Sequence, residues 1–133
     1  METTGQTILV VEDEQLLLDL LKEMLEGEGY RVLTATDGHQ AVELYRSEKD
    51  KVSLVLSDMG LPGMGGWDVL RQLKAINPTV NVILSSGFMD TKVRQDMIKS
   101  GAKDFIQKPY TPENVLKQIR DSMLPGENKQ KGF

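Results

Sequence analysis

The sequence predicts an α/β fold of the (βα)5 type, a doubly wound five-stranded parallel sheet with helices on both faces. The main observation is that short β-branched segments alternate five times with longer amphipathic segments, the pattern of a parallel sheet covered by helices. The chain of 133 residues is 39% hydrophobic and 27% charged. It is therefore long enough to bury one core and lacks the composition of a disordered or fibrous protein.

Five apolar or β-branched segments are the expected strands. The first, third and fourth are nearly continuous apolar runs, which is typical of strands buried on both faces of a parallel sheet. We therefore expect these three in the centre of the sheet. In chain order the predicted strands are Thr7–Val11, Tyr30–Ala35, Leu54–Ser57, Val80–Leu84 and Asp104–Gln107.

The first helix has the strongest helical periodicity. Its predicted inward stripe, at a spacing of 3.6 residues, consists of Leu17, Leu20, Leu21, Met24 and Leu25. Two glycines follow the stripe at positions 27 and 29, and glycine commonly ends a helix because it tolerates a left-handed backbone.

The other four helices are predicted mainly from their end signals. The last one begins with a capping hydroxyl followed by a proline, which is tolerated at the first helical position, and turns Leu116, Ile119 and Met123 inward. The expected ranges are Gly38–Ser47 behind an Asp37 cap, Trp67–Ile76 before Asn77-Pro78, Asp90–Ser100 before Gly101, and Thr111-Pro112 to the stop at Pro125-Gly126.

One domain is expected over residues 7–124. Residues 1–6 are expected to be a disordered leader, and residues 125–133, which are polar, a flexible tail. No apolar stretch approaches the roughly 18 residues of a membrane span, and the N-terminus does not resemble a signal peptide. We therefore expect a cytoplasmic protein that does not contact a membrane.

Composition excludes several classes of function. The 16 basic residues are outnumbered by 20 acidic ones, and no run of like charge suits nucleic acid, so direct nucleic-acid binding is not expected. The absence of cysteine excludes disulfides, thiolate zinc sites and a thiol nucleophile, and the single histidine, His39, supplies histidine-based sites poorly. The chemistry must therefore come from carboxylates, hydroxyls and amines.

Polar residues follow the predicted strands at the ends where such a sheet binds ligands. In an open α/β sheet the site lies outside the carboxyl ends of the strands. Since parallel strands end at one edge, these side chains are expected to meet. They are Glu12, Asp13 and Glu14 after the first strand, Asp58 after the third, Ser86-Gly87 after the fourth and Lys108-Pro109 after the fifth.

This set of residues suits phosphoryl transfer. Two unit charges about 4 Å apart repel by roughly 4 kcal/mol at an effective dielectric constant near 20, so clustered carboxylates need a cation. Mg²⁺ is suited because it uses one or two carboxylates together with water and phosphate oxygens, and Lys108 can add a second positive charge. A carboxylate can accept a phosphoryl group, with Ser86 as a hydroxyl donor to the transferred oxygens.

At these residues the chain closely resembles the receiver domain of bacterial two-component signalling, the response-regulator family. The resemblance covers about Thr7 to Leu124. It rests on four ordered motifs: Leu9–Asp13 (LVVED), Leu56–Gly66 (LSDMGLPGMGG), Leu84–Gly87 (LSSG) and Phe105–Pro109 (FIQKP).

The resemblance implies a role for each residue at the edge of the sheet. The phosphoacceptor is Asp58, and Mg²⁺ (or Mn²⁺) is held by Glu12, Asp13, Asp58 and the backbone carbonyl of Gly60. Lys108 pairs with the phosphoryl group or with Asp58.

The resemblance also implies switch residues and a strand order. Ser86 takes the hydroxyl position and bonds the phosphoryl oxygen on switching, while Phe105 takes the aromatic switch position. A cis peptide is expected before Pro109, and the strand order is the flavodoxin-like 2-1-3-4-5.

The implied function is that of a phosphoacceptor in a phosphorelay. A sensor histidine kinase or phosphotransfer protein supplies the phosphoryl group, and the surface formed by the fourth helix, fifth strand and fifth helix then changes for a downstream protein target or output domain. The family also allows a phosphorylation-linked dimer. The chain acts on itself and is not expected to be an enzyme with a separate substrate.

Most of these residues, though not Glu12, also have a purely structural interpretation. Asp13 could cap the first helix, Asp58 could serve the turn that follows its strand, and Ser86-Gly87 and Lys108-Pro109 could mark turns. All four structural interpretations would have to be correct at the same time for this edge of the sheet to have no function.

Competing functions fit less well. A phosphohydrolase needs a second acid to activate water, a flavodoxin-like cofactor binder needs a phosphate loop where Glu12-Asp13-Glu14 stands, and a phosphorylation-independent binding module does not need the acid cluster. A stand-alone receiver and one excised from a hybrid sensor histidine kinase both remain open. Gly60 and Phe88 depart from the more usual pattern beside the site and are expected to affect phosphoryl lifetime.

Overall fold

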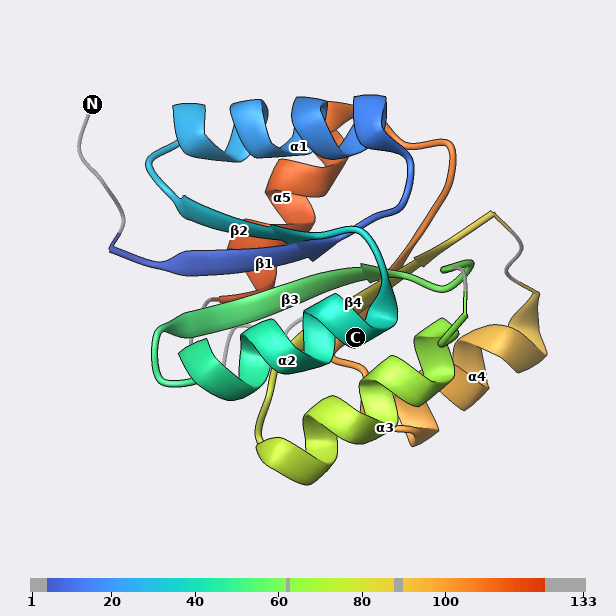
Figure 1. Cartoon of the computed structure of the whole chain (residues 1–133). Helices are drawn as coiled ribbons and strands as arrows, with labels where there is room; N and C mark the ends of the chain where they lie inside the picture. The colour runs from blue at the N-terminus through green and yellow to red at the C-terminus, as the bar shows by residue number, and fades with distance from the viewer. Residues whose placement is uncertain (1–4, 62, 88–89, 124–133) are drawn as a thin grey trace.

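The computed structural model describes residues 5–61, 63–87 and 90–123. Within them, parallel strands form one sheet in the order β2-β1-β3-β4-β5, as expected (Figure 1). The strands are β1 (Thr7–Val11), β2 (Arg31–Ala35), β3 (Val52–Asp58), β4 (Val82–Ser86) and β5 (Asp104–Gln107). The helices are α1 (Gln15–Gly27), α2 (Gly38–Glu48), α3 (Gly66–Ile76), α4 (Thr91–Lys99) and α5 (Pro112–Ser122).

Helices cover both faces of the sheet, with α1 and α5 on one face and α2, α3 and α4 on the other (Figure 1). Successive residues of a strand point to opposite faces, so each central strand supplies two cores. In β1, Ile8 and Val10 pack with α1 and α5, whereas Leu9 and Val11 pack with α2 and α3. This double burial explains the unbroken apolar runs of β1, β3 and β4, which are confirmed as the central strands.

The predicted stripe of α1 was wrong at one position. Leu20 is 47% exposed, while Leu18, which the stripe omitted, is 2% exposed and lies in the core with Leu21 and Leu25. Six leucines from position 16 to position 25 allow two overlapping stripes of helical period, and only the direction in which the helix meets the sheet distinguishes them.

The fourth strand lies two residues later than predicted. Val80 is buried, as its apolar side chain suggested, but its N–H donates to the carbonyl of Asn77 in a turn instead of joining the sheet. The ladder with β3 begins at Val82 and ends where Ser85 pairs with Asp58. Ser86 is consequently the last residue of β4 and does not follow it.

Side chains cap three helices, two of them at the predicted residues Asp37 and Thr111, while Asp90 was predicted as the first residue of its helix and is its cap instead. Asp37, Asp90 and Thr111 accept hydrogen bonds from the backbone N–H groups three residues later. At α1 the capping interpretation of Asp13 was wrong, because Glu14 stands at the N-cap and makes no side-chain cap. Asp13 is therefore not needed by the helix.

A close backbone contact holds the loop after Asp58. The N–H of Gly66 donates to the carbonyl of Met59, and a Cβ at Gly66 would lie 2.6 Å from the Met59 Cα. Only glycine permits this approach, which brings the start of α3 back against the end of β3.

The chain ends lie mostly outside the described residues. Within the predicted leader, Gln6 accepts a hydrogen bond from the Arg31 N–H through its carbonyl. Most of the leader, the tail at residues 125–133 and Phe88 are not described. In the described part of the chain, no helix has both the length and the apolar character that crossing a bilayer requires.

Two adjacent leucines of α1, the buried Leu21 and the exposed Leu20, provide a test of which face of the helix lies in the core. We expect Leu21→Ala to lower the free energy of unfolding by about 2–5 kcal/mol, because it leaves a cavity between α1 and the sheet. Leu20→Ala, the matched control, should cost less than about 1 kcal/mol. Urea unfolding of both variants measures the difference, and equal losses would contradict the assignment.

Candidate functional site

Three carboxylates meet at the carboxyl ends of β1 and β3. One ligand oxygen from each of Glu12, Asp13 and Asp58 can be chosen so that all lie within 4.8 Å of one another. Glu12 and Asp58 are buried, at 2% and 7% exposure, while Asp13 is exposed. The expected cluster is confirmed, with two buried carboxylates, those of Glu12 and Asp58, and one solvent-exposed carboxylate, that of Asp13.

The ammonium of Lys108 lies between the two buried carboxylates. Its Nζ is 3.1 Å from Oε1 of Glu12 and 3.4 Å from Oδ2 of Asp58. The other oxygen of Glu12 accepts a hydrogen bond of 3.0 Å from the N–H of Glu14. The side chain that directly follows the last strand, Lys108, thus partly offsets the charge of the acids at the ends of β1 and β3.

Burial and pairing act in opposite directions on these groups. Burial raises the pKa of Glu12, and the hydrogen bonds from Glu14 and Lys108 only partly oppose this rise. Burial disfavours the Lys108 ammonium, but the hydrogen bond to Glu12 and the nearby Asp58 charge outweigh it, so the pKa of Lys108 is raised. Lys108 accordingly remains a cation at neutral pH.

Backbone hydrogen bonds between strand ends hold the site in register. The N–H of Met59, directly after Asp58, donates to the carbonyl of Ser85 at 2.8 Å. The N–H of Lys108 donates to the carbonyl of Ser86 at 2.9 Å. Ser86 is half-buried and pairs with the residue immediately before Lys108, so the structure places it at the same edge as the acids.

Gly60 lies beside the Asp58 carboxylate. A Cβ at this position would be 3.8 Å from Oδ2 of Asp58, an ordinary van der Waals contact. Gly60 therefore leaves space next to the carboxylate that a larger residue could fill without distorting the backbone. The peptide between Lys108 and Pro109 is cis, as the resemblance implied.

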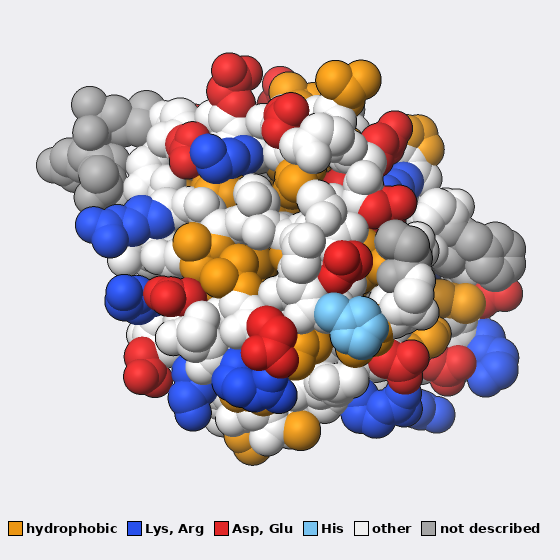
Figure 2. Space-filling view, viewed as in Figure 1, with side chains coloured by type: hydrophobic (Ala, Val, Ile, Leu, Met, Phe, Trp, Pro, Cys, Tyr) orange, Lys and Arg blue, Asp and Glu red, His pale blue; other side chains and the backbone are white. Residues whose placement is uncertain are grey.

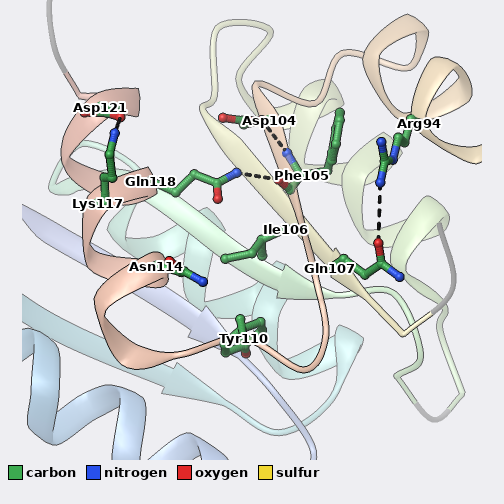
Figure 3. Close-up of a pocket in the computed structure, with 10 residues that line it drawn as sticks. All are labelled: Arg94, Asp104, Phe105, Ile106, Gln107, Tyr110, Asn114, Lys117, Gln118 and Asp121. Carbon is green, nitrogen blue, oxygen red and sulfur yellow. Dashed lines mark hydrogen bonds and ion pairs between the residues drawn. The ribbon is translucent and has the colours of Figure 1, made fainter. Parts of the chain in front are cut away.

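Phe105 lies on β5 and its ring is half-buried among α4 residues. The guanidinium carbon of Arg94 is 5.6 Å from the ring centroid (Figure 3). Asp104 accepts a hydrogen bond from the Phe105 N–H, and the side-chain amide of Gln118 donates to the Phe105 carbonyl (Figure 3). Side chains from α4, β5 and α5 thus converge on this one residue.

Sequence reasoning missed Tyr110 as a neighbour of the site. Tyr110 is half-buried two residues past Lys108, and burial raises its pKa to about 12. It lines a cavity of about 490 Å³ beside the acids, together with Glu14, Leu17, Gly87, Lys108 and Pro109. No sequence pattern marks a tyrosine that follows a turn proline as part of a site, so only the folded structure shows that Tyr110 lies beside the acids.

His39 takes no part in the site. The only histidine of the chain is exposed on α2 (Figure 2). On the face shown in Figure 2, basic and acidic side chains intermingle without forming a surface of one sign. Trp67, to which the sequence assigned no role, packs against the core between the sheet and α3.

The arrangement suits a hard divalent cation and a phosphoryl group. Carboxylate oxygens are the preferred ligands of Mg²⁺, which keeps several waters and commonly binds phosphate oxygens at the same time. Asp13 is exposed, whereas both oxygens of Glu12 already accept hydrogen bonds. The donor set therefore fits a partly hydrated ion at the solvent edge better than one enclosed by protein.

Comparison with known proteins agrees with this geometry. The family model described as the response regulator receiver domain matches residues 8–120. The chemotaxis protein CheY of Thermotoga maritima is 34% identical over 86% of this chain and 95% of its own length. The DNA-binding response regulator MtrA of Mycobacterium tuberculosis is 38% identical over 90% of this chain.

A solved structure extends the comparison to three dimensions. The crystal structure of the CheX-CheY-BeF3-Mg complex from Borrelia burgdorferi superposes with a TM-score of 0.86. Its sequence is 26% identical, and the match covers 90% of each chain. Relatives differ in length: this chain spans 95% of CheY, about half (51%) of MtrA and 31% of a cyclic di-GMP phosphodiesterase of Thermotoga maritima.

Tyr110 gives a pH-dependent prediction. An alkaline titration of phenolate absorbance should show a phenol ionising near pH 12 that is missing in Tyr110→Phe. Because the folded pKa lies above the ordinary value of 10, the neutral phenol's contribution to stability is complete below pH 10 and lost as the pH rises toward 12. Loss of an ionisation near pH 10 in Tyr110→Phe would contradict the burial of this phenol.

Proposed function

This chain belongs to the response regulator receiver domain family, and on that basis we propose that it accepts a phosphoryl group on Asp58. The observation that carries the proposal is the contact of one ammonium, that of Lys108, with both Asp58 and Glu12, beside the solvent-facing carboxylate of Asp13. A nucleophile, two further acids and a cation thus lie at the carboxyl edge of the sheet, where α/β folds bind phosphate ligands.

Mg²⁺, or Mn²⁺, is the proposed cofactor. Glu12, Asp13, Asp58 and the backbone carbonyl of Gly60 would hold it. When bound, the ion would neutralise part of the carboxylate charge and polarise the phosphoryl oxygens. The Borrelia complex, which contains a beryllium fluoride and magnesium according to its description, supports the choice of ion.

Asp58 is the proposed nucleophile. One of its carboxylate oxygens attacks the phosphorus of the donor, the bond from phosphorus to the donor's histidine nitrogen breaks, and the imidazole leaves with that electron pair. The product is an acyl phosphate on Asp58 and an unphosphorylated donor. Lys108, 3.4 Å from Oδ2 of Asp58, is placed to pair with an equatorial phosphoryl oxygen, where charge develops during transfer.

Ser86 and Phe105 are the proposed switch residues. Ser86 ends β4 at the same edge as Asp58, so its hydroxyl is suited to follow a phosphoryl oxygen. Phe105 lies three residues before Lys108 on the adjacent strand. Movement at these positions would change the surface formed by α4, β5 and α5, the proposed recognition surface for a downstream target, an output domain or a second phosphorylated copy.

The proposed donor is a sensor histidine kinase or a phosphotransfer protein. Since such a donor draws its phosphoryl group from ATP, the proposed location of the domain is the cytoplasm. In this proposal, transfer and later hydrolysis both occur on the chain itself, so the domain acts as a self-modifying switch without a separate substrate. Relatives of very different lengths share this domain, which leaves both a stand-alone receiver and a receiver within a hybrid kinase or larger regulator consistent with the proposal.

The decisive experiment uses acetyl phosphate as a small donor. Incubation with Mg²⁺ should add the mass of one phosphoryl group, and the gain should disappear in Asp58→Asn and without the ion. Asp121→Asn, which alters an exposed ion pair of α5, serves as the control and should be phosphorylated like the original chain. Absence of an adduct, or an adduct on Asp58→Asn, would overturn the proposal.

Gly60 gives a prediction about phosphoryl lifetime. We expect Gly60→Asn to slow hydrolysis, because the new side chain would start 3.8 Å from Oδ2 of Asp58 and cover a path for water. A barrier raised by about 1.4 kcal/mol would lengthen the lifetime about tenfold. Gly65→Asn, where a Cβ meets nothing within 4 Å, is the matched control. A hydrolysis time course that is equal in both variants would reject this role.

A further inference from the structure

Helix α4 is held to the rest of the domain by few buried side chains. Within Thr91–Lys99 the only buried residue is Met97, and the neighbouring Ile98 is 49% exposed. By contrast, α3 buries Gly66, Val69, Leu70 and Leu73. An element with so little buried apolar surface can shift at low cost in free energy, so its remaining contacts determine where it lies.

Arg94 supplies two of those remaining contacts, both to β5. Its guanidinium stacks near the Phe105 ring, 5.6 Å from the centroid, and a guanidinium nitrogen lies 3.4 Å from Oε1 of Gln107 (Figure 3). Phe105 and Gln107 are alternate residues of a strand, so they face the same side of the sheet. A single side chain therefore connects α4 to two successive positions on one face of β5.

The β5 end of this connection leads directly to the acidic site. Gln107 immediately precedes Lys108, whose ammonium contacts Glu12 and Asp58. The backbone around Phe105 is held separately by Asp104 and by Gln118 of α5. β5 is thus held on the α5 side by Gln118, and in the described part of the chain Arg94 makes a polar contact that joins β5 to α4.

We propose that Arg94 is a positioning residue that fastens α4 to β5 in the unphosphorylated domain and opposes the switch. The inference rests on the proposed function. A phosphoryl group on Asp58 would compete for the Lys108 ammonium and so change the strand end to which Arg94 is joined. Since Arg94 stabilises one arrangement, its contacts must be given up or remade when α4 moves, and their loss favours the phosphorylated arrangement.

The same side chain borders a groove beside β5. The groove, about 510 Å³, runs between α4 and α5 and is lined by Arg94 on one side and by Asn114, Lys117 and Gln118 on the other (Figure 3). Release of Arg94 from Gln107 would therefore also alter the wall of this groove. Arg94 therefore belongs both to the proposed recognition surface and to the contact that opposes the switch.

The test measures binding of beryllium fluoride, an analogue of the phosphoryl group, in saturating Mg²⁺. Trp67, the only tryptophan, is a suitable reporter because it lines a cavity with Ser100 at the end of α4. We expect Arg94→Gln to bind about three- to fivefold more tightly, which corresponds to the loss of one exposed cation–π contact. Arg94→Lys keeps the charge but not the planar group, so its affinity should lie between that of the original chain and that of Arg94→Gln.

A matched control separates this contact from a general effect of charge. Lys92 lies on the same helix and pairs with Asp96 instead of β5. Lys92→Gln removes one positive charge, as Arg94→Gln does, and should leave the affinity unchanged. Hydrogen exchange without ligand provides a second readout: the amides of α4 should exchange faster in Arg94→Gln than in Lys92→Gln.

The outcomes distinguish this inference from the proposed function. If the original chain binds the analogue but Arg94→Gln binds it equally or more weakly, the inference is wrong and the phosphoacceptor site stands. A lower melting temperature in Arg94→Gln with unchanged affinity would likewise reduce Arg94 to a structural contact. If the original chain binds no analogue, the proposed function fails, and unchanged exchange in α4 would then reject the Arg94 contact independently.

Discussion

The Lys108 ammonium, held between the carboxylates of Glu12 and Asp58, is the interaction on which the site depends. These acids come from β1 and β3, and at the distances of the site their mutual repulsion would reach several kcal/mol without a nearby cation. Lys108 comes from β5, which is two strands away from β3 in the sheet order. The strand order and the hydrogen bonds between strand ends together bring this one amine to the acids.

The fold was largely predictable because the burial of a strand determines which of its positions must be apolar. Strands covered on both faces must be apolar throughout, so β1, β3 and β4 could be placed in the centre before the structure was known. The ends of the strands and the inward face of α1 depended on tertiary interactions that the hydrophobic pattern of the sequence does not show. Val80 is as apolar as the residues of β4, yet its N–H is used by Asn77, and Leu20 and Leu18 differ only in how α1 meets the sheet.

The members of the site were predictable for a different reason: parallel strands end together, so polar residues after several strands must share an edge. The contacts among them were not predictable in the same way. The Glu14 N–H that bonds Glu12, the burial of Tyr110 and the stacking of Arg94 near Phe105 join residues by geometry alone. None of them has a spacing or composition that marks it in the sequence, because each depends on the direction of a side chain in the folded protein.

The two hydrogen bonds to the Phe105 backbone also bear on how the domain behaves among copies of itself. β5 is an edge strand, and the unpaired backbone groups of such a strand are a template on which another chain can add. Asp104 already occupies the outward N–H of Phe105, and Gln118 occupies its carbonyl. With four residues in β5, these two hydrogen bonds occupy part of the template that the edge would otherwise offer to another chain.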